Sequence, residues 1–450
     1  MKLILVLAVA LQVFISNTEC YNYKEVVQKS LLFYEAQRSG KLPADQRVKW
    51  RKDSALNDKG VHGEDLTGGY YDAGDFVKFG FQMSFTATIL AWGLIDHKKG
   101  YEEADSLEEG RKALKWALDY ILKAHVSENV LYAQVGSCTT DHNNWGRPED
   151  MTEARPAFMI NTTHPGSDMA AETAAALAAG YMVFKDVNAT YANTLLTHAK
   201  QLYSFAYKYR GKYSDAFTDV EGCYNSSGYE DELVWGAAWL YRATEDKTYL
   251  TYVDKEYTPI QYYIGFSWDQ KAGGADVLLA KITGDSKYLT KMKNYCDQIM
   301  TTQQRTPKGL IFISQWGSLS STAYVMQICL ETAALGVNAA TYRAEAKKQI
   351  NYMLGDTGFS YLVGFGSKYP THCHHRAASC PDAPATCGWA QFSTPDPNPH
   401  VLTGALVGGP GANDDYTDVR NDYVHNEVAT YYNSGFQTVV AALIELGYSD

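Results

Sequence analysis

The stretch ADSLEEGRKALKWALDYILKAH, residues 104–125, places apolar side chains three or four positions apart. Leu107, Leu114, Ala117 and Ile121 fall on one face of a helix with this spacing, and charged residues fill the opposite face. The same periodicity recurs along the chain and predicts twelve helices. They are expected over residues 22–38, 82–97, 104–125, 168–185, 190–209, 229–243, 247–264, 273–283, 286–304, 321–335, 340–354 and 434–447.

Strand-like stretches are few and short, and no linker or low-complexity segment divides the 450 residues. We therefore expect one all-α domain. Twelve helices without a break favour helical hairpins arranged in a closed ring over a four-helix bundle. Long segments without helical periodicity separate some of the helices, and loops of this length in a compact domain usually carry function. They span residues 39–81, 126–166, 210–228, 306–320 and 355–433.

The composition excludes some classes of partner. The formal net charge is −11, and no basic tract occurs, which argues against a nucleic-acid partner and favours a substrate with little charge. With 46% hydrophobic residues the chain can bury a large core. The 34 tyrosines and nine tryptophans supply flat rings that suit stacking on sugar faces as well as core packing.

The N-terminus has the pattern of a secretory signal peptide. Lys2 precedes an apolar run over residues 3–15, and a short polar stretch then ends at Cys20. The run is too short for a membrane span, and no later segment approaches that length. We therefore expect a signal peptide over residues 1–20, a catalytic domain over residues 21–450, and a secreted, extracellular protein without a membrane partner.

Of eight cysteines, Cys20 lies in the predicted signal peptide, which leaves seven. Cys380 and Cys387 flank a short proline-containing loop, and an oxidising compartment makes a disulfide between them plausible. The odd count leaves at least one free thiol, for which Cys296 and Cys329 are the candidates because they fall within helical patterns. Sequons for N-glycosylation begin at Asn161, Asn188 and Asn225.

The segment NDYVHNEVATYYNS, residues 421–434, surrounds one carboxyl group, that of Glu427, with aromatic and polar side chains. Aromatic rings exclude water and raise the pKa of a carboxyl group, while Asn and His can orient it by hydrogen bonds. Glu427 is therefore a candidate general acid. A solvent-facing glutamate beside the start of a Tyr-rich helix is the alternative.

The segment GEDLTGGYYDAGDFVKFG, residues 63–80, contains two aspartates three positions apart. Asp72 and Asp75 can reach the same water molecule, which one could hold and the other deprotonate. Turn-forming aspartates that bond their own backbone, or a partial calcium loop, are the alternatives. Together with Glu427, the pair matches the needs of inverting glycoside hydrolysis, in which an acid protonates the leaving oxygen and a base activates water on the opposite face.

Several motifs together support a closer assignment. GGYYDAGDFVKFG begins at residue 68, PGSDMAAETAAALAA at residue 165 and SSGYEDELVWGAAWLYRAT at residue 226, and FYEAQRSGKLP lies near the start. The C-terminal signature comprises Tyr416, Asp418, Tyr423, Glu427, Ala429, Asn433 and Ser434. These motifs resemble those of glycoside hydrolase family 9 cellulases across the mature chain. The resemblance implies an (α/α)6 barrel, with Asp75 as base, Asp72 as its partner in positioning water, and Glu427 as acid.

A further motif of the resemblance is SYLVGFGSKYPTHCHHR, residues 360–376. The active-site His and Arg of the family fall on His374 and Arg376, whereas Cys373 replaces the usual apolar residue. Both side chains are donors that can bind sugar hydroxyls and developing charge. A metal site formed by His372, Cys373, His374 and His375 is the alternative, although adjacent residues rarely aim at one ion.

The loop SSGYEDEL, residues 226–233, raises the question of calcium. Ser227, the Gly228 carbonyl, Asp231 and Glu232 offer oxygen ligands, and the family resemblance adds Asp269. We expect a structural calcium ion here and no catalytic cofactor. The alternative is a capping box, in which Ser227 and Glu230 begin the next helix.

Aromatic residues of the loops are candidates for stacking on sugar rings. They are Trp145, Trp268, Trp316 and Tyr423, and His142 beside Trp145 is a further candidate substrate contact. Core packing is the alternative for each tryptophan. Trp235 and Trp239, four positions apart in a predicted helix, are expected in the core.

These features predict a secreted, monomeric endo-β-1,4-glucanase that hydrolyses β-1,4-glucan with inversion. A processive or exo-acting relative and an inactive glucan-binding protein are the alternatives. We expect optimal activity at mildly acidic pH, because the acid must be protonated while the base is ionised.

Overall fold

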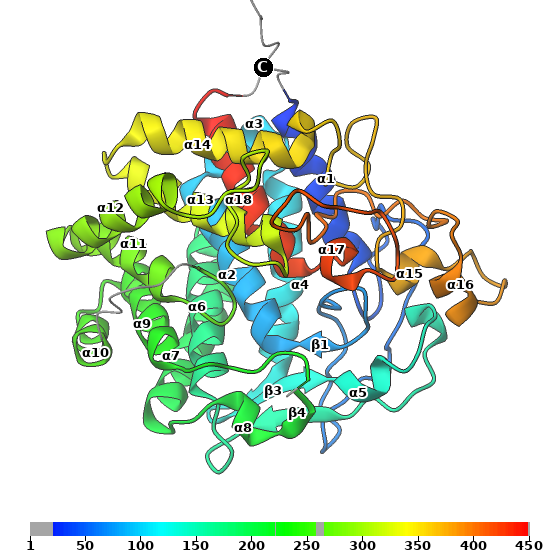
Figure 1. Cartoon of the computed structure of the whole chain (residues 1–450). Coiled ribbons are helices and arrows are strands. Elements are labelled where there is room, and N and C mark those ends of the chain that lie inside the picture. The colour runs from blue at the N-terminus through cyan, green and yellow to red at the C-terminus, as the bar shows by residue number, and fades with distance from the viewer. Residues whose placement is uncertain (1–20, 221, 258–264, 449–450) are drawn as a thin grey trace, which may run out of the picture.

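The computed structural model describes residues 21–448 except for residues 221 and 258–264, so the predicted signal peptide and the end of the helix predicted over 247–264 lie outside it (Figure 1). Twelve long helices lie at the predicted places in this part. They are α1 (Tyr23–Ala36), α2 (Gly80–Asp96), α4 (Leu107–Ala124), α6 (Ser167–Phe184), α7 (Ala189–Lys208), α9 (Glu230–Thr244), α10 (Thr248–Glu256), α11 (Ala272–Thr283), α12 (Ser286–Thr301), α13 (Ser318–Ala334), α14 (Ala339–Asn351) and α18 (Thr430–Glu445). None of the helices in the described residues is both long and apolar enough to cross a membrane.

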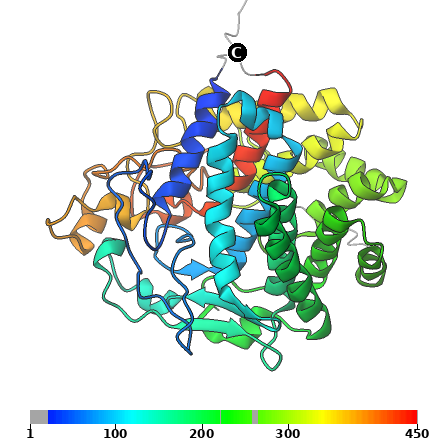
Figure 2. The ribbon, with the colours of Figure 1, turned by 180° about the vertical axis from the view of Figure 1, so that it is seen from behind.

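Six of these helices form a closed inner ring. α2, α6, α9, α11, α13 and α18 contact one another in this order, and α18 returns to α2. The other six alternate with them along the chain and pack outside: α4 on α2, α7 on α6, α10 on α9, α12 on α11, α14 on α13, and α1 on α18. Figure 2 shows α1 and α4 side by side on the outer layer. The predicted (α/α)6 barrel is thereby confirmed.

Burial explains which helices are inside. Every residue of α6 from Ser167 to Gly180 is buried, and so is every residue of α18 from Thr430 to Ile444. A helix that is apolar on all sides is stable only when other elements surround it. α4 instead buries one face and leaves its charged face in solvent, as expected of an outer helix. On α9, Trp235 and Trp239 are fully buried against Trp92, as predicted.

Ion pairs link the C-terminal ends of the inner helices. His97, which follows α2, lies 3.3 Å from Glu331 of α13 and 3.0 Å from Glu445 of α18. A cation at a helix C-terminus also interacts favourably with the helix dipole. Asp96 of α2, Arg242 of α9 and Lys281 of α11 complete the network. It connects five of the six inner helices at the end of the barrel where they finish.

The long segments between the helices contain a small antiparallel sheet. Its central strand β3 (Val130–Val135) pairs with β1 (Lys78–Phe79), β2 (His125–Ser127) and β4 (Ala157–Ile160). β1 leads directly into α2, so the sheet holds the residues that precede this inner helix. Short helices also connect or follow the long ones: α3 (Lys98–Glu103), α5 (Cys138–Asp141), η1 (Pro148–Asp150), α8 (Tyr213–Ala216), η2 (Thr218–Val220), η3 (Tyr352–Asp356), α15 (Arg376–Ser379), α16 (Trp389–Ser393) and α17 (Tyr423–Asn426).

The described residues contain three disulfides, which are Cys138–Cys223, Cys296–Cys329 and Cys380–Cys387. Cys380 and Cys387 are the pair expected from the sequence. The prediction of a free thiol at Cys296 or Cys329 is wrong, because the neighbouring helices α12 and α13 bring these two residues together. The free cysteine of the described residues is the buried Cys373.

Candidate active site

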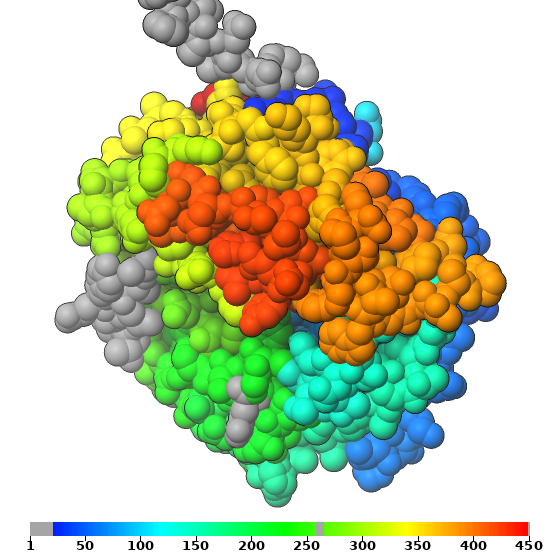
Figure 3. All heavy atoms as spheres, turned by 45° about the vertical axis from the view of Figure 1, so that its right-hand side comes forward, coloured from blue at the N-terminus to red at the C-terminus, as the bar shows by residue number. Residues whose placement is uncertain are grey.

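A cleft of about 1010 Å³ lies at the N-terminal ends of the inner helices. Three residues that directly precede inner helices line it: Phe79 before α2, Gly317 before α13 and Ala429 before α18. Gln270, two residues before α11, lines it too. The long loops form the walls. Figure 3 shows the hollow between the orange and red C-terminal loops and the green and cyan segments.

The two aspartates of the predicted base motif lie on the loop before β1, and both are buried. The Asp72 carboxylate accepts hydrogen bonds from the hydroxyl groups of Tyr224 (2.5 Å) and Thr430 (3.3 Å). Burial and the neighbouring charge of Asp75 raise the pKa of Asp72 to about 7. Asp75 itself lines the cleft. At mildly acidic pH, Asp72 therefore carries a proton beside Asp75.

Glu427 follows α17 and faces the same cleft. Its backbone pairs with His374 in a parallel bridge, which connects the acid to the third predicted motif. Burial raises the pKa of Glu427 well above its ordinary range, and the charges of Asp75 and Asp72 raise it further. Arg376 opposes this shift without reversing it. The raised pKa favours the protonated form of Glu427, which a general acid requires.

Backbone contacts join segments from opposite ends of the chain. The Gly74 carbonyl accepts a hydrogen bond from the amide of Arg376 (3.2 Å), and the Asp72 carbonyl accepts one from the amide of Thr430 (2.8 Å). A Cβ atom at Gly74 would lie 2.3 Å from the carbonyl oxygen of His374, so this approach requires glycine. The contacts place Asp72 and Asp75 beside the loop that bears the acid.

His374 and Arg376 both line the cleft, as the motif predicts. The His374 Nδ1–H donates to the carbonyl of Arg420 (2.8 Å), which leaves Nε2 for other partners. Burial lowers the pKa of His374 to about 4, so its ring is neutral. The guanidinium of Arg376 lies 2.7 Å from the carboxylate of Asp141. A neutral imidazole, whose Nε2 can accept a hydrogen bond, and one cation therefore lie close to Glu427.

Two polar residues of the site were not selected from the sequence. The carboxylate of Asp141 clusters with Asp75 and His142, with ligand atoms within 4.8 Å of one another. Burial and the charge of Asp75 raise the pKa of Asp141 to about 6. Its position directly before His142 is the signal that could have indicated it. Tyr224, the hydrogen-bond donor to Asp72, lies in a loop segment without a comparable signal.

Exposed aromatic rings line the cleft. Trp316 and Tyr423, with ring centroids 5.7 Å apart, are 50% and 51% exposed. Trp389 on α16 is 49% exposed, although the sequence did not distinguish it from other tryptophans. Flat rings with free faces can stack on pyranose rings. The three rings therefore suit the binding of a saccharide chain.

The other predicted substrate contacts differ in exposure. Trp145 lines the cleft but is only 7% exposed, because Nε1 donates to Ser379 (2.9 Å) and the ring packs 5.2 Å from that of His374. It supports the cleft wall and offers little free surface for stacking. Trp268 lines the cleft and is partly buried, whereas His142 is exposed there.

The residues predicted to bind calcium lie together at the start of α9. Asp269 accepts a hydrogen bond from the amide of Ser227 (2.8 Å), and Asp231 accepts one from the amide of Lys271 (2.6 Å). One carboxylate oxygen of Glu232 lies 3.0 Å from the Lys271 ammonium group, while the other is buried without a hydrogen-bond partner in the described residues. Burial and the charge of Asp231 raise the pKa of Glu232 well above its ordinary range. Glu232 is buried, Gly228, Asp231 and Asp269 are half-buried, and Ser227 is exposed. Oxygen ligands gathered at the start of one helix can suit a hard cation.

The alternative metal site at residues 372–375 does not form one ligand cluster. The rings of His372, His374 and His375 hydrogen-bond to three separate partners, Asp418, Arg420 and Gln37. Successive side chains along this segment therefore point to different surroundings. Among the described residues, these side chains do not bring their ligand atoms together.

The fold and the cleft define an (α/α)6-barrel glycoside hydrolase, with a protonated acid and an aspartate pair between aromatic rings. The sequence model of glycosyl hydrolase family 9 matches residues 23–440. The chain belongs to this family.

Individual relatives are similar over nearly the whole chain. Endoglucanase B of Cellulomonas fimi is 48% identical over 94% of this chain, which spans 42% of that protein's length. Endoglucanase 14 of Arabidopsis thaliana is 43% identical, with 94% of this chain and 93% of that protein covered. The solved structure of an endoglucanase from the termite Nasutitermes takasagoensis is 59% identical in sequence and superimposes with a TM-score of 0.94. The match covers 95% of this chain and 99% of the termite chain.

Proposed function

We propose that this protein is a secreted endo-β-1,4-glucanase that hydrolyses internal bonds of cellulose or a related β-glucan with inversion. The observation that carries the proposal is that Glu427 and Asp75 line one cleft, with Asp72 close enough for its charge to raise the pKa of Glu427. The names of the relatives, which are endoglucanases, support the same activity.

The residues divide the reaction as follows. Glu427 protonates the leaving glycosidic oxygen, because its raised pKa keeps the proton available. Asp75 removes a proton from the attacking water, and Asp72 orients that water. Hydrogen bonds from Tyr224 and Thr430 hold the Asp72 carboxyl group in place. Attack from the face opposite the leaving group inverts the anomeric centre.

The surrounding side chains bind the sugar. His374 Nε2 accepts a hydrogen bond from a sugar hydroxyl, and the Arg376 guanidinium donates to sugar hydroxyls and to negative charge that develops at the scissile bond. The exposed faces of Trp316, Tyr423 and Trp389 stack on successive sugar rings. A cleft with three such rings along its walls favours binding in the middle of a glucan chain.

The test of the activity is the release of reducing ends from a soluble cellulose derivative. An endo enzyme lowers the viscosity of the polymer early, and inversion yields the α-anomer first in proton NMR. Glu427→Gln and Asp75→Asn should each lower kcat by at least about 10²-fold, since general acid–base catalysis contributes about 10²–10⁴-fold. Glu128→Gln, at an exposed site, is the matched control.

Several results would contradict the proposal. A loss smaller than about tenfold in either variant would contradict the assigned roles. A viscosity that falls only in step with total product would favour exo or processive action. Binding of the polymer without turnover by the wild type would indicate a glucan-binding protein.

A structural calcium ion at Ser227, Gly228, Asp231, Glu232 and Asp269 supports this fold in our proposal. The observation in its favour is the buried carboxylate oxygen of Glu232 that has no hydrogen-bond partner in the described part of the chain. Bound calcium would hold the start of α9 against the loop of Asp269 and would take no part in the proton transfers. Removal by a chelator should lower the melting temperature, and added calcium should restore it. An unchanged melting temperature and no calcium in elemental analysis would exclude the ion.

Secretion and subunit state complete the proposal. The apolar N-terminal segment supports cleavage of a signal peptide over residues 1–20. The secreted protein should begin at Tyr21 by N-terminal sequencing, and it should sediment as a monomer. An uncleaved N-terminus in the cell, or a dimer in sedimentation, would contradict these two points.

A further inference from the structure

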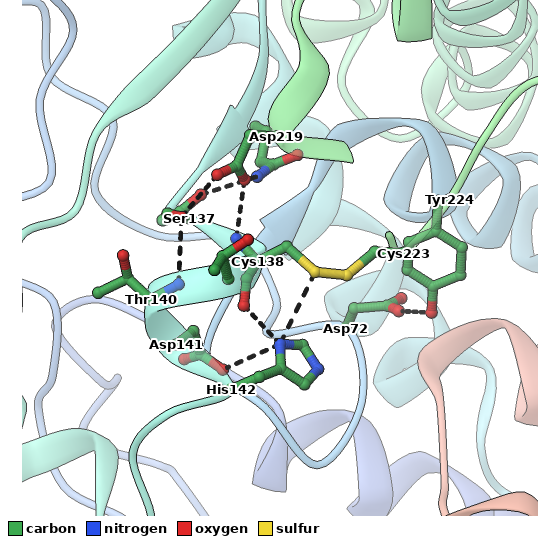
Figure 4. The surroundings of a disulfide bond; sticks show 12 residues. Asp72, Ser137, Cys138, Thr140, Asp141, His142, Asp219, Cys223 and Tyr224 are labelled. Carbon is green, nitrogen blue, oxygen red and sulfur yellow. Dashed lines mark hydrogen bonds and ion pairs between the residues drawn. A yellow bond between two sulfur atoms is a disulfide. The ribbon is translucent and has the colours of Figure 1, made fainter. Parts of the chain in front are cut away.

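The short helix α5 is fixed at its start by a neighbouring loop (Figure 4). The disulfide Cys138–Cys223 joins the two segments covalently. The carboxylate of Asp219 accepts hydrogen bonds from the hydroxyl group of Ser137 (2.6 Å) and the amide of Cys138 (2.8 Å). The last residue of the helix, Asp141, is therefore held in a defined place at the cleft.

The carboxylate of Asp141 joins two parts of the active site. It is 2% exposed, and Oδ1 accepts a hydrogen bond from the amide of Phe76 (3.2 Å), the residue after Asp75. Oδ2 lies 2.7 Å from Nη1 of Arg376. The Arg376 guanidinium also lies over the rings of Phe76 (5.5 Å) and Trp145 (5.8 Å). The buried carboxylate of Asp141 thus contacts both the backbone of the loop that bears Asp75 and the guanidinium of Arg376, which lies close to Glu427.

We propose that Asp141 is a positioning residue of this hydrolase, which holds the Asp75 loop and Arg376 in the geometry that proton transfer requires. The inference rests on the function proposed above. Asp141 acts through its neighbours and exchanges no proton with substrate.

The charges around the two carboxyl groups allow a test by pH. The ionisable groups that face Asp141 are Asp75, Arg376, His142 and Arg155. Those that face Glu427 are Asp75, Asp72 and Arg376, together with the hydroxyl groups of Tyr224, Tyr431 and Tyr432. Arg376 lowers the pKa of Glu427, and the charge of Asp141 offsets part of this effect. Loss of that charge should lower the pKa of Glu427, so the basic limb of the kcat profile should move to lower pH.

The experiment measures kcat and KM of the full-length Asp141→Asn variant on a soluble cellulose derivative across the active pH range. We expect kcat to fall by about tenfold or more, KM to change by less than about threefold, and the basic limb to move to lower pH by about half a unit or more. Asp141→Glu, which keeps the charge, should return the limb to its wild-type position. Asp150→Asn removes an exposed acid near the same segment and should match the wild type.

A double-mutant cycle identifies the partner. If Asp141 acts through Arg376, the double variant with Arg376→Gln should be no slower than Arg376→Gln alone. The double variant removes both charges of the buried pair and leaves no unpaired charge. It therefore provides the test if Asp141→Asn alone does not fold. A double variant at least about tenfold slower than Arg376→Gln would overturn the inference.

Further outcomes separate positioning from stability. Asp141→Asn with kcat within about twofold of the wild type and an unmoved basic limb would refute the positioning role. Lower kcat with an unmoved limb and a reduced free energy of unfolding would do the same, because it would show a purely structural role. An inactive wild type would refute the proposed function, whereas an active wild type with an unaffected variant would refute the positioning role alone.

Discussion

Gly74 is the place where the base loop touches the backbone of the loop that follows Cys373. A Cβ atom at Gly74 would lie 2.3 Å from the carbonyl oxygen of His374, 3.1 Å from its carbonyl carbon and 3.2 Å from the Cα atom of His375. All three are backbone atoms, so no side-chain rotation can relieve the contact. Gly74→Ala should therefore separate the two loops.

The size of the effect follows from this distance. Ordinary contact between heavy atoms needs about 3.5 Å, so one loop must move by about 1 Å. A misplacement of about 1 Å in an active site costs about 10²-fold in rate, and overpacking of a buried contact costs about 1–3 kcal/mol. The displacement would move Asp75 and would also disturb the hydrogen bond from the Arg376 amide to the Gly74 carbonyl. We expect kcat/KM to fall by about 10²-fold and the free energy of unfolding to fall by about 1–3 kcal/mol.

The assay combines initial rates on a soluble cellulose derivative with urea unfolding. Gly146→Ala is the matched control, because a Cβ atom there meets no described atom within 4 Å although the residue follows Trp145 in the cleft wall. The control should keep kcat/KM within about twofold of the wild type. If Gly74→Ala keeps more than about a tenth of wild-type kcat/KM with unchanged stability, the loops do not depend on this contact.

Three other predictions concern charge and hydrogen bonding. Burial lowers the pKa of His97, but Glu331 and Glu445 outweigh it and raise the value to about 9. The unfolded value is about 6.5, so the pairs contribute up to about 3 kcal/mol below that pH and lose it as pH rises through 9. Urea unfolding of the wild type and His97→Gln should differ more at pH 6 than at pH 9.5, and equal differences would contradict the linkage. Tyr224→Phe removes the donor to Asp72 and should lower kcat about tenfold with little change in KM; unchanged kcat would leave the hydroxyl without a role. Activity should be greatest on the mildly acidic side, because Glu427 must hold its proton, and an optimum well above neutrality would contradict its assignment as the acid.

The sequence indicated the helices and both catalytic motifs because these depend on local pattern. The apolar spacing around Leu114 is a property of neighbouring residues, and so is the aromatic composition around Glu427. Contacts between distant segments leave no comparable local pattern. The Cys296–Cys329 disulfide, for example, depends on the packing of α12 against α13. The proposed role of Asp141 likewise depends on its contact with Arg376, which lies much later in the chain.

Exposure was a second property that local pattern did not reveal. Trp145 and Trp316 both lie in polar loops, yet Trp145 is 7% exposed and Trp316 is 50% exposed. The difference arises because the ring of Trp145 packs on His374 and hydrogen-bonds to Ser379. A tryptophan offers the same ring in either place, so only its packing neighbours determine whether a sugar can reach it.

The order of apolar and charged residues was sufficient to specify twelve helices, because helix formation with one buried face follows from the spacing of side chains. It also indicated the acidic groups that we propose for the reaction. The distinct chemistry of these groups came from packing. The pKa of Glu427 is raised because folding removes its carboxyl group from water and brings Asp75 and Asp72 beside it from the opposite end of the chain. A pKa depends on burial and on nearby charge, and both exist only once the barrel has closed.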